Sequence, residues 1–169
     1  MYRTNWFDRK FPPIVDNGLF PGILERLEGT PARLKDKISR IQNNLTFSPN
    51  GKWSIQMEVG HLIDLEPLWR ERALQIIGNQ RELQVADLTN RKTHETDYDN
   101  MDMEVLLAQF TDLRDDLMTV LRSVAEEDLE KTAVHPRLKT PMKLIDLAFF
   151  VAEHDDHHLA QMTILTELK

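Results

Sequence analysis

Apolar residues recur at helical spacing in long stretches of this chain, and this periodicity restricts the fold more than any other feature of the sequence. Residues 19–27 and 30–45 predict a first helical stretch, 54–78 a second, 102–124 a third and 142–168 a fourth. None of these stretches shows the alternation of apolar and polar residues that half-buried strands require. The pattern therefore predicts an all-α fold, a four-helix bundle.

Capping signals indicate where these helices begin. Thr30-Pro31 and Thr140-Pro141 each place a capping residue before a proline, which is typical of a helix start. Ser54 and Asp102 are further candidate N-caps. The segment 79–101 is polar and weakly periodic, and we predict a long crossover there, of the kind needed when neighbouring helices run parallel.

The length and composition of the chain indicate one domain covering residues 1–169. Residues 1–18 mix aromatic residues with Pro and Asn-Gly breakers and predict a non-helical arm packed on that domain. The net charge of −7, without a basic stripe, argues against nucleic acid as a partner. With no apolar stretch long enough for a membrane span and no signal-like N-terminus, a cytoplasmic protein is expected.

The chain has no cysteine, so a metal site would have to use nitrogen and oxygen ligands. Half of its six histidines lie in one pentapeptide of the fourth helix, which contains His154, His157 and His158. On a helix, His154 and His158 lie about 40° apart and ~6 Å along the axis, so both imidazoles can reach one metal ion. His157 projects to the other side and is a poor third ligand. His61, on the second helix, is the best candidate to complete the set.

Other interpretations of the histidines stay open. Three histidines and a water are typical of an open catalytic zinc site, but a purely structural histidine cluster is also possible. The spacing His154-x-x-x-His158 resembles the zincin motif with Asp for Glu, although too few residues follow for a downstream ligand. A di-iron site needs two Glu-x-x-His elements, and only Glu58 to His61 qualifies. His94 and His135 are expected to be solvated loop residues.

Several polar residues could support the metal ligands. Gln161 projects about 20° from His154 on the helical wheel and could orient a ligand or a bound water. Asp64 and Glu58 lie within reach of His61 and are candidate partners of its imidazole. Glu66 is predicted to be solvated or paired with Arg70.

Three segments carry a family resemblance, namely Trp53-Ser54-Ile55, then Gly60-His61-Leu62-Ile63-Asp64-Leu65-Glu66, then a helix after Thr140-Pro141 that carries His154-Asp155-Asp156-His157-His158-Leu159-Ala160-Gln161. Together and in this order, they give the chain a resemblance to the DinB/YfiT-like family of metal-dependent enzymes. It implies a four-helix bundle of unusual topology, often dimeric, with His61, His154 and His158 around one Zn or Ni ion.

Relatives in that family include thiol-dependent S-transferases and an isomerase that uses a low-molecular-weight thiol, while many members have no assigned reaction. The resemblance therefore implies a metal-dependent S-transferase or hydrolase acting on a small molecule. Because the chain has no cysteine, a reacting thiol would have to be a cosubstrate. A bundle that binds metal without turnover, or that acts in a stress response, is the alternative.

Overall fold

The computed structural model describes residues 4–41, 45–48 and 51–167. Its helices are α1 Phe20–Glu28, α2 Thr30–Ser39, α3 Ile55–Ile77, α4 Arg91–Glu95, α5 Met103–Arg122 and α6 Leu144–Glu167. Two short antiparallel strands, β1 Ala133–Val134 and β2 Pro141–Met142, form a hairpin before α6. The predicted all-α bundle is confirmed, and this hairpin is a small addition to it.

The first predicted helical stretch is shorter than expected and is interrupted by Gly29. Gly29 keeps right-handed helical dihedral angles, so α2 follows α1 almost directly. Thr30 is therefore not a cap: its hydroxyl donates to Asp155 Oδ2 at 2.9 Å. The helix ends at Ser39, before the predicted Leu45, and residues 42–44 lie outside the described residues.

The predicted caps at Ser54 and Asp102 are confirmed, because each side chain accepts a backbone hydrogen bond at the start of its helix. The predicted helix start at Thr140-Pro141 is wrong. Pro141 lies in β2, since the Thr140 carbonyl accepts from the His135 N–H and closes the hairpin. Helix α6 begins three residues later, where Asp146 Oδ2 accepts from the N–H of Lys143.

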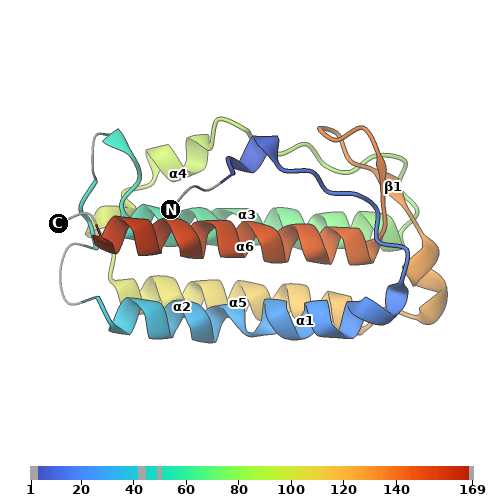
Figure 1. Cartoon of the computed structure of the whole chain (residues 1–169), viewed down its shortest axis with the longest axis horizontal. Helices are drawn as coiled ribbons and strands as arrows, with labels where there is room; N and C mark the ends of the chain where they lie inside the picture. Colours follow the sequence, from blue (N-terminus) through green and yellow to red (C-terminus); the bar gives the residue numbers. More distant parts are fainter. Residues whose placement is uncertain (1–3, 42–44, 49–50, 168–169) are drawn as a thin grey trace.

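The order of the helices in the bundle differs from a simple hairpin array. Helix α3 packs against α5 and α6, and α1 packs against the same two helices. Figure 1 shows that α3 and α5 run in the same direction, while α6 returns in the opposite one. The chain between α3 and α5 must therefore travel back along the bundle, which confirms the predicted crossover at residues 79–101. This segment also contains α4 and a 3-10 turn, Tyr98–Asn100.

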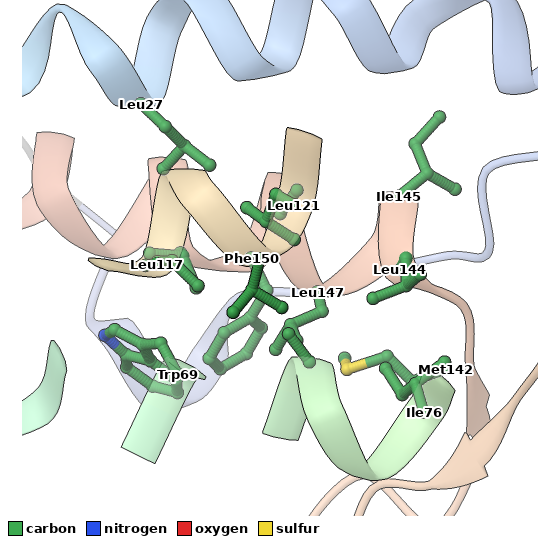
Figure 2. Close-up of a cluster of buried hydrophobic side chains, with 14 of the residues drawn as sticks. Leu27, Trp69, Ile76, Leu117, Leu121, Met142, Leu144, Ile145, Leu147 and Phe150 are labelled. Atoms are coloured by element: carbon green, nitrogen blue, oxygen red, sulfur yellow. The ribbon is translucent and has the colours of Figure 1, made fainter. Parts of the chain in front are cut away.

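Two hydrophobic clusters fill the interior along the length of the bundle. The larger cluster joins α1, α3, α5 and α6, and Figure 2 shows Trp69 at one of its ends, with Phe150 nearer the middle. Met142, from the hairpin, packs beside Ile76 and Leu144 at the other end. The hairpin and the bundle therefore share one core, which fixes the hairpin relative to α3 and α6.

Three buried charged residues cross this interior. The guanidinium of Arg114 on α5 lies 2.5 Å from Glu66 on α3 and 2.7 Å from Asp155 on α6, and all three side chains are at most 1% exposed. Arg114 also donates to the carbonyl of Leu27 at the end of α1. The prediction that Glu66 is solvated or paired with Arg70 is therefore wrong: Glu66 faces the core, where Arg114 is its partner.

The N-terminal arm packs along α6 and contains a 3-10 turn at Trp6–Asp8. The ring of Trp6 contacts Phe150 at 5.0 Å, and the N–H of Ile14 donates to Asp146 at 2.7 Å. The arm, the crossover and the hairpin together cover the outer side of the α3 and α6 pair (Figure 1). In the part of the chain that the structure describes, every helix is too short or too polar to cross a lipid bilayer.

Candidate metal centre

Three histidines converge where α3 and α6 pack against each other. Each of His61, His154 and His158 offers a ligand atom, and these atoms all lie within 4.8 Å of one another. The Nε2 atoms of His154 and His158 are 3.1 Å apart, and the three side chains are nearly buried. The fold therefore brings together the three histidines that the sequence predicted to converge.

Hydrogen bonds at Nδ1 set the orientation of two of these imidazoles. His158 Nδ1 donates to the carboxylate of Glu58, one turn before His61 on α3. His61 Nδ1 lies 3.2 Å from the hydroxyl oxygen of Thr93, and that hydroxyl donates to Asp64 at 2.8 Å. Because the Thr93 hydroxyl gives its hydrogen to Asp64, its oxygen must be the acceptor toward His61, and His61 carries its proton on Nδ1. When such a ring is neutral, its Nε2 atom is an unprotonated acceptor.

The support for His61 comes from the crossover, which the sequence did not indicate. Asp64 acts on His61 through Thr93 and not directly, and it is held in turn by the hydroxyl of Tyr98 at 2.7 Å and by Lys92 at 2.9 Å. Tyr98 lies so close to α3 that a Cβ on Gly60 would be 2.3 Å from its ring. A glycine one residue before His61 therefore allows this support to form.

The protein holds two of its clustered histidines, His61 and His154, in the neutral form. Burial, and after it the neighbouring His158, lower the pKa of His61 to about 3. Burial, and after it the neighbouring His158 and His61, also hold the pKa of His154 well below its ordinary value. Neutral imidazole is the form that binds metal ions, so no proton has to be displaced from these rings at pH 7.

His154 has the least complete hydrogen bonding of the three. Its ring lies beside the rings of Trp6, at 5.1 Å, and Trp69, at 5.5 Å. Its Nδ1 is buried without a hydrogen-bond partner among the described residues, and its Nε2 faces the acceptor Nε2 of His158. Two imidazole Nε2 atoms directed at each other, with His61 beside them, are a donor set that fits a cation such as Zn²⁺ or Ni²⁺.

The histidines line a cavity of about 460 Å³, a volume within the range of small-molecule sites. Its walls come from the arm, α3, the crossover, the hairpin and α6, and include all three tryptophans of the chain: Trp6, Trp53 and Trp69. His157 also lines this cavity but is not one of the three converging histidines. Gln161 does not line this cavity but an adjoining, more open hollow, together with Glu58 and His158.

The two histidines expected to be solvated differ from each other. His94 is exposed, as predicted, although it lies in the short helix α4, where its ring contacts Trp53 at 5.6 Å. His135 is only 2% exposed and lines the cavity, so the prediction for His135 is wrong. The hairpin explains the difference, because it turns the residue before Pro136 toward α3 and α6.

The fold and the site together define a helical bundle with a buried three-histidine cluster beside a small-molecule cavity. The chain belongs to the DinB superfamily, because the model of that family matches residues 21–162. Among solved structures, it is similar to YfiT from Bacillus subtilis, with 21% identity, a TM-score of 0.80, and 94% of this chain and 92% of that chain covered. YfiT is described as a probable metal-dependent hydrolase with an unusual four-helix bundle topology. A comparison with curated proteins finds no match.

Proposed function

We propose that the protein is a metal-dependent hydrolase of small molecules and that His61, His154 and His158 bind its metal ion. The observation that carries this proposal is the convergence of three imidazoles, with ligand atoms within 4.8 Å of one another, on the wall of a cavity. Three protein ligands leave room for a water or a substrate atom, which is typical of catalytic sites and not of closed structural ones. The description of YfiT supports the same class of reaction.

Zn²⁺ and Ni²⁺ are the ions that we propose for the site, because imidazole suits both and the cluster contains neither thiolate nor carboxylate ligands. A divalent cation held there would act as a Lewis acid and would lower the pKa of a water or thiol that it binds.

The chain's own residues position and protect this chemistry. Glu58 and Thr93 fix the ring orientation and the tautomer of His158 and His61, a role that partners of metal-ligating histidines commonly have. The tryptophans and Phe150 form apolar walls that can hold the body of a substrate and exclude bulk water. Asp64 is held by Thr93, Tyr98 and Lys92, which makes it a positioning residue.

Metal binding tests the first half of the proposal. We expect the purified protein to take up one Zn²⁺ or Ni²⁺ per chain, and His61→Ala, His154→Ala and His158→Ala each to weaken binding strongly. His157→Ala is the matched control, because His157 lies on the same helix and lines the same cavity but stands outside the cluster. Equal losses in all four variants, or a protein that takes up no metal, would refute the assignment.

Turnover tests the second half. We expect the metal-loaded protein to hydrolyse small esters or amides, and chelation or His158→Ala to abolish the activity. The same preparation is then given an electrophilic acceptor with glutathione, bacillithiol, mycothiol or coenzyme A. Metal-dependent consumption of one thiol without hydrolysis would replace the hydrolase proposal with thiol S-transfer. Metal binding without either reaction would leave a metal-binding module.

A further inference from the structure

Arg72 is a buried cation that has no carboxylate partner in the described part of the chain. Its side chain on α3 is 2% exposed, and it lines the cavity that the three histidines also line. Its Nε and Nη2 donate to the carbonyl of Gln84 at 3.0 and 2.7 Å, and its Nη1 lies 3.2 Å from His135 Nε2. Arg114, the other fully buried arginine, is balanced by two carboxylates. Within the described residues, no carboxylate forms an ion pair with Arg72.

His135 adds a second donor at the same point. Its Nδ1 accepts from the backbone N–H groups of Arg137 and Leu138, both at 3.2 Å. A neutral imidazole that accepts at Nδ1 carries its proton on Nε2. The Nε2–H of His135 and the Nη1–H groups of Arg72 are then all donors, and none of them can accept from the other. An oxygen acceptor between them would satisfy both side chains.

Arg137 supplies a further cation at this end of the cavity. Its guanidinium lies over the ring of Phe7 at 5.4 Å, and its Nη2 is buried without a hydrogen-bond partner in the described part of the chain. Burial, and after it the nearby charge of Arg137, lower the pKa of Arg72 to about 10. The two cations therefore repel each other in the absence of an anion.

The acidic residues that line the cavity are engaged elsewhere. Glu82 lies 3.5 Å from Lys139, and both side chains are largely exposed. The carboxylate of Asp87 accepts from Thr89 and from the N–H of Arg91, within its own loop. Neither carboxylate reaches Arg72 or Arg137. Glu82 and Asp87 therefore leave the excess of N–H donors and of positive charge at this end of the cavity unbalanced.

We propose that Arg72, His135 and Arg137 bind an anionic group, a carboxylate or a phosphate monoester, on the substrate whose reacting group lies at the three histidines. This inference rests on the proposed function for the position of the reacting group, but the donor excess is independent of any metal. Aromatic rings connect the two ends: the ring of Phe150 contacts His135 at 5.5 Å and Trp6 at 5.0 Å, and Trp6 contacts His154 at 5.1 Å. The substrate is therefore a small amphipathic acid with an apolar middle.

Binding of matched probes tests the proposal without requiring turnover. The probes are 4-phenylbutyrate, 3-phenylpropyl phosphate and the uncharged 4-phenylbutanol, titrated by calorimetry into zinc-loaded and into chelator-treated protein. Tryptophan fluorescence reports where they bind, because every tryptophan of the chain lines the cavity. We expect at least one anionic probe to bind about tenfold more tightly than the alcohol in both preparations, as charge-assisted hydrogen bonds predict. The anionic probe that binds more tightly shows whether the site prefers a carboxylate or a phosphate.

Three variants show which residues cause the preference for anionic probes. Arg72→Met and Arg137→Met should each remove most of it, whereas Lys139→Met, which removes a cation at an exposed position of the same cavity, should keep it. Arg137 is partly exposed on the hairpin, so its variant gives a result even if Arg72→Met does not fold. Equal affinity for all three probes would overturn the proposal. So would a preference that needs zinc and survives both arginine variants, because the anion would then bind at the metal.

The two proposals fail in distinguishable ways. If the protein takes up no metal but prefers the anionic probes, the hydrolase proposal fails and the anion site stands. If it binds metal and shows no preference, only the anion site fails.

Discussion

We expect Arg114→Met to lower the free energy of unfolding strongly at neutral pH and much less at acidic pH. Arg114 links α5 to Glu66 on α3 and to Asp155 on α6, in a region where none of the three side chains is more than 1% exposed. Methionine fills a similar length but carries no charge. The substitution therefore leaves two buried carboxylates facing each other without a cation.

The expected loss of stability follows from the charge that remains. At least one of the two carboxyl groups must take up a proton to stay buried. For a carboxyl with an ordinary pKa near 4, this costs about 4 kcal/mol at pH 7. Removing one partner from a buried ion pair generally costs about 3–5 kcal/mol, which agrees with that value. Below pH 7 the cost of protonation falls by about 1.4 kcal/mol per pH unit, so the variant should recover most of its stability by pH 4.5.

Urea denaturation between pH 4.5 and 7.5, followed by circular dichroism, measures this difference. Arg122→Met is the matched control, because Arg122 lies two turns further along α5 and pairs with Glu28 at the surface, where both side chains are about half exposed. We expect this control to lose less than about 1 kcal/mol at any pH. A similar loss for the two variants, or an Arg114→Met loss that does not change with pH, would refute the reasoning.

Three further outcomes follow from the histidine cluster. Thr93→Val removes the acceptor of the His61 Nδ1–H and should weaken zinc binding roughly 10- to 100-fold in competition with a chromogenic chelator; unchanged affinity would show that Thr93 does not orient His61. Gly60→Ala places a Cβ 2.3 Å from the ring of Tyr98 and should cost about 1–3 kcal/mol in thermal unfolding, unless the crossover can shift freely. The folded-state pKa of His61, about 3, lies below its ordinary value of 6.5, so the unfolded chain binds more protons between these values. Metal-free protein should therefore lose about 1.4 kcal/mol of stability per pH unit as the pH falls through this window, and His61→Gln should show a shallower slope.

The helices and the histidine cluster could be predicted from the sequence because both depend on the helical repeat. Spacing of three and four residues defines one face of a helix, and His61, His154 and His158 lie on the faces where α3 and α6 meet. Glu66 was misassigned although the same period places it correctly. It lies between Leu62 and Trp69 in the buried stripe of α3, and Arg114 has the same place in α5.

The parts of the site that could not be predicted lie in segments without a regular repeat of apolar residues. Thr93 and Tyr98 reach the site from the crossover, and His135 reaches it from the hairpin, so each is placed by tertiary packing. Thr140-Pro141 carried a valid local signal for a helix start. The pairing of β1 with β2 outweighed that signal, because the hairpin gives the same backbone groups other partners.

The antiparallel pairing of α3 and α6 has a consequence for how the site is assembled in time. Glu58 and His158 contact each other across 100 residues of sequence, and two of the three clustered histidines lie on the last helix. Chains emerge from the ribosome with the N-terminal residues first, so α3 is complete long before its partner exists. His61 alone cannot hold an ion, and the long loop between the two helices must close before the cluster forms. Capture of the metal would then mark the end of folding, and an ion bound at this site would report that the whole bundle has closed.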